Sequence, residues 1–247
     1  MPPEKAEEAR AELLEFAAHG FEEQDLPGAL ELAVYGGPEV EEALREHFGE
    51  VSAEVVEPGW EDRWKSFHQP VAIGKLWVGP PWEEPGAGLV PVVIDPGRAF
   101  GTGAHPTTRL CLELLQELEP GSLLDIGCGS GVLAIAAARL GFVPVTALDN
   151  DPVAIEATRQ NAEVNAVSFE VRLADAFAEE LPAADVAVCN ISLQLLEELA
   201  PRLQCGLLVA SGFLVVDELR LAGYEIVSRQ EQAEWAAVLA RPERSGR

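Results

Sequence analysis

Leu123–Ala137, LLDIGCGSGVLAIAA, places three glycines between an apolar run typical of a buried strand and one typical of a helix. Gly127, Gly129 and Gly131 stand where the backbone must turn sharply and let a ligand approach closely. Their spacing is G-x-G-x-G, and Val132 occupies the place of the third glycine in the dinucleotide fingerprint G-x-G-x-x-G. The spacing therefore disfavours a pyrophosphate and favours S-adenosylmethionine (SAM), which carries no phosphate.

From Gly121 onward, short apolar runs alternate with helical patterns. The expected strands are 122–127, 144–149, 168–175, 184–190 and 206–212, and the expected helices are 132–140, 151–166 and 193–203. The tail, 223–242, has the pattern of two further strands joined by a polar turn. The alternation predicts an α/β fold, a doubly wound, Rossmann-like domain of seven strands, with an antiparallel pair ending a parallel sheet.

The chain before this domain has a different pattern. Residues 5–18 and 38–48 have helical spacing, and residues 29–35 and 50–57 alternate like strands, which predicts a small α+β domain over 1–57. Residues 58–94 are rich in Trp, Pro and Gly and indicate a linker and cover segment. The catalytic domain is then expected over 95–247.

Composition bounds the class of protein. The formal net charge of −25 repels nucleic-acid phosphate and attracts basic partners, although an acidic solubilising surface explains it equally well. No apolar run reaches the roughly 18–20 residues that span a bilayer, and the acidic N-terminus is no secretory signal. The four scattered cysteines indicate reduced thiols rather than a zinc site. We expect a cytoplasmic monomer without metal that binds neither nucleic acid nor membrane.

Polar residues follow the expected strands of the sheet. Asp149 ends the second, where a carboxylate can accept hydrogen bonds from both ribose hydroxyls of an adenosine. Its alternative role, capping the helix that starts at Pro152, is better filled by Asn150 or Asp151. Asp175, after the third strand, could meet the adenine amino group, or serve as a cap or a solvated surface residue.

Asn190 ends the fourth strand, and the carboxyl ends of strands line the site in a doubly wound sheet. Its side-chain carbonyl can accept a hydrogen bond from a substrate N–H. Methylation of nucleobase or glutamine amides is associated with N-P-P-Y at this position, whereas Ile191 and Ser192 follow here. This departure argues against a DNA methylase.

A second glycine-rich loop, DPGRAFGTGAHPTTRL, occupies Asp95–Leu110. With 57–82, 125–137, 148–165 and Asn190–Ser192, its sequence closely resembles the ribosomal protein L11 methyltransferase family. The resemblance covers about Pro58 to the end, and this loop is its most specific motif. Family members have a small ferredoxin-like domain, which holds the protein substrate, and a SAM-binding domain. They methylate lysine side chains and the N-terminal amine of ribosomal protein L11.

The chain also departs from the family pattern. It begins directly in the first helix, where the family has a preceding strand, so we expect a shortened recognition domain. The third-strand region and the C-terminal strands match loosely. The resemblance therefore supports the chemistry more strongly than the acceptor.

The resemblance implies a division of labour between the two loops. The loop at Gly127 seats the methionine part of SAM. The earlier loop folds over the cofactor as a lid, with Phe100 near the sulfonium and Thr108 reaching a polar group, while Gly101 and Gly103 let the backbone approach. His105 either contacts the ligand or is structural. The expected cofactor-binding set is Phe100, Gly101, His105, Thr107, Thr108, Asp125, Gly127, Gly129, Gly131, Asp149, Asn150, Asp175 and Asn190.

The expected function is SAM-dependent methylation of lysine and N-terminal amines of a basic protein, ribosomal protein L11. Transfer to an amine is an in-line displacement that mainly needs positioning, and Asn190, the expected catalytic residue, would orient the amine without a general base. Two alternatives stay open. The acceptor could be another protein's lysines or a small amine, or the chain could be a non-catalytic binding module.

Overall fold

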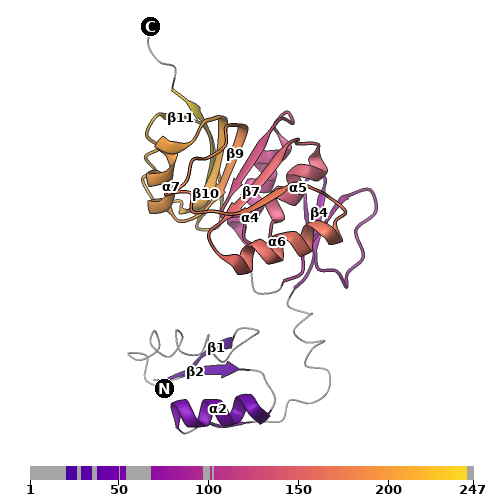
Figure 1. Ribbon diagram of the computed structural model, residues 1–247, viewed down its shortest axis with the longest axis vertical. Coiled ribbons are helices and arrows are strands. Elements are labelled where there is room, and N and C mark those ends of the chain that lie inside the picture. Colours follow the sequence, from indigo (N-terminus) through magenta and orange to yellow (C-terminus); the bar gives the residue numbers. More distant parts are fainter. Residues whose placement is uncertain are drawn as a thin grey trace. The chain divides into compact units, whose positions relative to one another are not determined.

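The computed structural model describes residues 21–26, 29–34, 38–49, 51–53, 68–96, 101 and 103–243. The chain divides into two compact units, Met1–Arg63 and Trp64–Arg247, each considered by itself (Figure 1). No helix within the described ranges is long and apolar enough to cross a membrane.

In the first unit, β1 (Phe21–Leu26) and β2 (Ala29–Val34) form an antiparallel hairpin in which Phe21 pairs with Val34. Helix α2 (Pro38–Phe48) has the bounds expected from its Pro start and apolar spacing. Strand β1 was not expected, because FEEQDL is apolar only at its two ends and shows no strand alternation. It is a strand because its backbone pairs with β2. The strand expected over 50–57 is wrong in its described part, since 51–53 are not in a strand, and the helix expected over 5–18 lies outside the described residues.

The second unit contains a seven-stranded sheet in the order β11-β12-β10-β9-β6-β7-β8. Strands β8, β7, β6, β9 and β10 run parallel, β12 runs antiparallel to β10, and β11 pairs antiparallel with β12. The bounds are β6 Leu123–Ile126, β7 Val145–Asp149, β8 Glu170–Leu173, β9 Ala184–Asn190, β10 Cys205–Leu214, β11 Tyr224–Gln232 and β12 Trp235–Pro242. The predicted α/β doubly wound fold is confirmed, including the antiparallel pair at the end of the sheet.

Helices pack on both faces of this sheet (Figure 1). They are α4 (Pro106–Gln116), α5 (Val132–Leu140), α6 (Pro152–Val164) and α7 (Leu193–Leu199), the last followed by the 3₁₀ helix Ala200–Arg202. Successive strand residues point to opposite faces, so Leu123 packs in the hydrophobic cluster with α4, α5 and α6, and Leu124 in the cluster with α7. The residues 106–110, expected as part of a loop, are the first turn of α4.

The described part of the expected linker and cover segment contains a three-stranded sheet. Strands β3 (Val71–Ile73) and β4 (Leu76–Gly79) are antiparallel, and β5 (Val90–Val93) is parallel to β4. Leu76, Val78 and Val92 are buried in the same cluster as α5, so this sheet is part of the second unit's core. The dense Pro and Gly residues concealed such short strands, and the domain bounds at 57 and 94 stay predictions.

A β-bulge shapes the end of the central strands. The register of β10 against β12 shifts between Ser211 and Phe213, and Gly212 between them has a φ of +103°. A Cβ at Gly212 would overlap the backbone carbonyl of Ile191, whose N–H donates to the Ser211 carbonyl at 3.2 Å. Glycine at this position therefore lets the backbone of Ile191, directly after β9, approach β10 closely beside Asn190.

Replacing Gly212 with alanine should lower the free energy of unfolding by about 2–5 kcal/mol, because strain at positive φ adds to backbone overlap. Gly223 is a matched control, since its φ is +83° and no heavy atom lies within 4 Å of a Cβ built there. Gly223→Ala should cost only about 1–2 kcal/mol. Urea denaturation of both variants measures the difference, and equal losses would contradict the proposed overlap.

Candidate functional site

The carboxyl ends of β6, β7 and β9 bring the expected residues of the second glycine loop, Asp149 and Asn190 to one edge of the sheet. The N–H groups of Gly127 and Cys128 both donate to the carbonyl of Leu148, at 2.9 and 3.0 Å. Gly131 begins α5 with a φ of +81°, and a Cβ there would meet Thr158 of α6 at 2.9 Å. Only a residue without a side chain lets α5 begin this close to α6.

The Asp149 carboxylate anchors the glycine loop. Its Oδ2 accepts from the Gly129 N–H at 2.9 Å, and its Oδ1 accepts from the Asp151 N–H at 3.0 Å. Each carboxylate oxygen can accept a further hydrogen bond, so a ribose contact stays a prediction beside this anchoring role. Asp151 caps α6 by accepting from the Val153 N–H at 2.8 Å. It is one of the two residues, Asn150 and Asp151, that were expected to fill this capping role. Asn150 is exposed.

Asp125 is fully buried at the same edge. Its Oδ2 accepts from the Ala134 N–H at 3.1 Å, whereas its Oδ1 has no hydrogen-bond partner among the described residues. Burial raises the pKa of this carboxyl to about 7, the Ala134 hydrogen bond lowers it and the charge of Asp149 raises it further. An orphaned buried carboxyl oxygen beside a second carboxylate favours a cationic ligand and disfavours a phosphate. These two acidic side chains therefore fit SAM, which carries a positively charged sulfur.

Two expected residues far apart in the sequence meet here. The Asn190 amide donates to the Thr108 hydroxyl at 3.4 Å across 82 residues of sequence, and Thr108 is fully buried in α4. Thr107 is turned toward His105, whose Nδ1 lies 2.7 Å from its Oγ1. His105 caps α4 and packs its ring edge-on against Trp235 at 4.9 Å. These contacts give His105 a structural role, and ligand contacts of His105 and Thr107 stay predictions.

Other expected residues are placed as follows. Phe100 lies outside the described residues, as do 97–99 and 102. Gly101 accepts a hydrogen bond through its carbonyl from the Ser130 hydroxyl at 2.5 Å, so the first loop contacts the second. Asp175 is exposed, and its Oδ1 accepts from the Phe177 N–H at 2.8 Å within a turn; no helix begins at this turn for Asp175 to cap. An adenine contact of Asp175 stays a prediction.

Sequence reasoning missed four buried polar residues around the loops: Ser130, Thr158, Asn161 and Asn165. Three of them lie on α6, spaced three and four residues apart, and this spacing was the available signal. Polar residues at the core positions of an amphipathic helix are unusual, because burying them costs free energy unless they are hydrogen-bonded.

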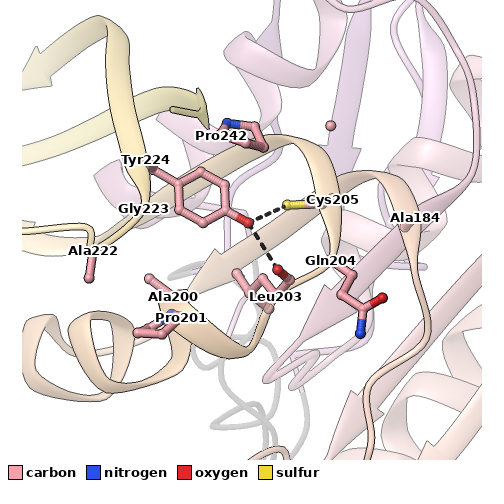
Figure 2. Close-up of a pocket in the computed structure, with 11 residues that line it drawn as sticks. Ala184, Ala200, Pro201, Leu203, Gln204, Cys205, Ala222, Gly223, Tyr224 and Pro242 are labelled. Carbon is pink, nitrogen blue, oxygen red and sulfur yellow. Dashed lines mark hydrogen bonds between the residues drawn. The ribbon is translucent and has the colours of Figure 1, made fainter. Parts of the chain in front are cut away.

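A cavity of about 450 Å³ opens elsewhere, at the amino ends of β9 and β10. Figure 2 shows Tyr224 reaching into it, where its hydroxyl lies 3.2 Å from Cys205 Sγ and donates to the Leu203 carbonyl at 3.3 Å. None of the expected site residues lines this cavity. It lies at the end of the sheet opposite the glycine loops and is separate from the candidate site.

The sequence of this chain is similar to those of one family of known proteins. Residues 34–243 match the family model described as ribosomal protein L11 methyltransferase (PrmA). The ribosomal protein L11 methyltransferase of Symbiobacterium thermophilum is 43% identical over 202 residues, 75% of this chain and 66% of that protein. That of Pseudomonas putida is 49% identical over 177 residues, 67% of this chain and 60% of that protein. The chain thus spans slightly less than two thirds of the length of these relatives.

A solved structure agrees with the fold. A crystal structure of ribosomal protein L11 methylase from Lactobacillus delbrueckii subsp. bulgaricus matches with a TM-score of 0.65 at 26% identity. The match covers 72% of this chain and 100% of that chain.

The pKa of Asp125 generates a pH-dependent prediction. The Asp125 carboxyl has a pKa of 3.8 in the unfolded chain and of about 7 in the folded protein. The folded state therefore binds a proton that the unfolded state has released, and the free energy of unfolding falls as the pH rises from about 4 to about 7. The loss should total about 4 kcal/mol. Denaturant titrations across this range should show a smaller decline for Asp125→Asn. Parallel curves for the wild type and the variant would contradict the assignment.

Proposed function

The chain belongs to the ribosomal protein L11 methyltransferase family, and from this we propose that it transfers methyl groups from SAM to lysine side chains and the N-terminal amine of ribosomal protein L11. The observation that carries the proposal is that the family match includes the whole edge of the sheet where both glycine loops, Asp149 and Asn190 meet. The sheet, the acidic residues Asp125 and Asp149 and the Asn190 amide all lie within the matched residues 34–243.

The cofactor would be held by the second glycine loop and Asp149. SAM would supply a methyl group that an uncharged amine attacks at carbon, so that an N–C bond forms, the C–S bond breaks and the sulfur leaves as a neutral thioether. The Asp149 carboxylate holds Gly129 in place and retains acceptor capacity for the ribose hydroxyls. The Asp149 carboxylate supplies negative charge toward a cationic ligand, and a bound cation would favour release of the proton that burial keeps on Asp125.

Asn190 would orient the acceptor. Its amide nitrogen is engaged by Thr108, so its side-chain oxygen is left to accept from the N–H of an incoming amine. A lysine of pKa about 10.4 carries its proton at pH 7, a deficit of about 4–5 kcal/mol for the neutral form. Desolvation beside the positively charged sulfur of SAM would lower the pKa of the acceptor amine. Positioning and exclusion of water then suffice without a general base.

The net charge of the chain suits a basic protein acceptor. The net charge of −25 attracts a cationic partner and repels nucleic-acid phosphate. We propose a cytoplasmic, monomeric enzyme, the small first unit of which contributes to recognition of the protein substrate.

Asp149→Ala should weaken SAM binding by about 1.5–3 kcal/mol, the range for hydrogen bonds that involve a charged group. Asp151→Ala is the matched control, because Asp151 only caps α6 and its loss should cost about 1 kcal/mol of stability. Isothermal calorimetry measures both affinities. An unchanged affinity in Asp149→Ala would remove this carboxylate from the cofactor site.

The proposed activity is tested with labelled SAM and purified ribosomal protein L11, beside a small amine as alternative acceptor. The label should appear on the protein, and Asn190→Ala should slow its transfer by about tenfold or more with little change in SAM affinity. Label on the small amine alone would overturn the proposed acceptor. Full turnover with poor SAM affinity in Asn190→Ala would assign this residue to cofactor binding.

A further inference from the structure

Helix α6 turns a polar face toward the core. Thr158, Asn161 and Asn165 are 0%, 2% and 1% exposed, and their spacing places them on one face of the helix. Buried polar side chains without partners are costly, so each must be satisfied by hydrogen bonds. Thr158 donates to the Gly129 carbonyl at 2.9 Å, which already links this face to the second glycine loop.

Asn161 joins the two glycine loops through a single amide. Its Oδ1 accepts from the Asp95 N–H at 3.0 Å, at the start of the first loop. Its Nδ2 donates to the Ser130 carbonyl at 2.9 Å, within the second loop. These partners lie 66 and 31 residues away in the sequence. The Asn161 side chain therefore fixes the position of the first loop at Asp95 relative to the second loop at Ser130.

Ser130 extends the connection. Its hydroxyl, in a side chain that is 1% exposed, donates to the Gly101 carbonyl at 2.5 Å. The first loop is therefore bonded at Asp95 by Asn161 and at Gly101 by Ser130, and Asn161 holds the backbone of Ser130. Loss of the Asn161 amide would remove the attachment at Asp95 and the side-chain bond that holds the Ser130 backbone, and so weaken the attachment at Gly101.

Asn165, the residue directly after α6, provides an internal comparison. It accepts from the Val93 N–H at 2.9 Å and donates to the Val93 carbonyl at 2.6 Å and to the Asn161 carbonyl at 2.8 Å. It is the same residue type and equally buried, and it makes one side-chain hydrogen bond more than Asn161, yet it holds strand β5 and not the second loop.

We propose that Asn161 is a positioning residue that fixes the two glycine loops relative to each other and thereby sets the affinity for SAM. The inference rests on the proposed function for its ligand. Backbone at Asp95 and Gly101 that is freed from the second loop would have to be fixed when the cofactor binds, and the cost of fixing it is subtracted from the binding free energy.

The test compares Asn161→Ala with Asn165→Ala in the full chain. Both should lower the melting temperature, and Asn165→Ala at least as far as Asn161→Ala, because Asn165 loses three side-chain hydrogen bonds and Asn161 loses two. SAM affinity, measured by calorimetry well below the melting temperature, should fall by about tenfold or more in Asn161→Ala and by less than about threefold in Asn165→Ala. Unchanged affinity in Asn161→Ala, or an equal loss in both variants, would overturn the proposal.

Ser130→Ala covers the case in which Asn161→Ala does not fold. It removes the hydroxyl bond to Gly101 and the long hydrogen bond from the Val132 N–H at 3.4 Å, and it should weaken SAM binding by about tenfold. Unchanged affinity would overturn the proposed coupling.

Amide NMR spectra separate this inference from the proposed function. The signals of Gly101 and Gly129 should both shift in Asn161→Ala and stay in place in Asn165→Ala. If the wild type binds no SAM, the proposed function fails, and the loop coupling is still decided by these shifts. Signals that stay in place in both variants would overturn it.

Discussion

The site depends on one constraint: backbone groups that leave the sheet in a buried glycine loop must still find hydrogen-bond partners. Between Gly127 and Ser130, these partners come from several elements. The Leu148 carbonyl, the Asp149 carboxylate and the Thr158 and Asn161 side chains of α6 each bond one or two of the loop's backbone groups. The loop is therefore rigid because the end of β7 and the buried face of α6 both support it.

This support determines the electrostatics of the site. The carboxylate that anchors Gly129 lies close enough to raise the pKa of Asp125, which is buried with one oxygen unpaired. Burying Asp125 beside Asp149 lowers the stability of the folded protein, and a cationic ligand bound near these two acids would offset that loss. Asn190 and Thr108 approach the same edge as neutral amide and hydroxyl groups, which suits orientation of an amine and needs no proton acceptor.

Long periodic segments were predictable from the sequence. The seven strands of the large sheet and helix α5 follow from apolar runs of the right length, and α2 begins at its proline as expected. Strand β1 and strands β3, β4 and β5 were missed. Their sequences are short, charged or interrupted by Pro and Gly, and they are strands because neighbouring strands supply their hydrogen bonds. Pairing of this kind depends on partners and leaves no period in the sequence.

For the site, the sequence by itself determined which residue types stand at the ends of the strands: the three glycines, Asp149, Asp175 and Asn190. Only the tertiary structure decided what each one contacts. It engaged Asp175 with the backbone of its own turn and Asp149 with Gly129, and it brought Asn190 to Thr108 across 82 residues. It also showed that Asn161 bonds both loops. Local pattern is set by the periods of strand and helix, whereas hydrogen bonds between distant segments form only once the sheet and its helices are packed.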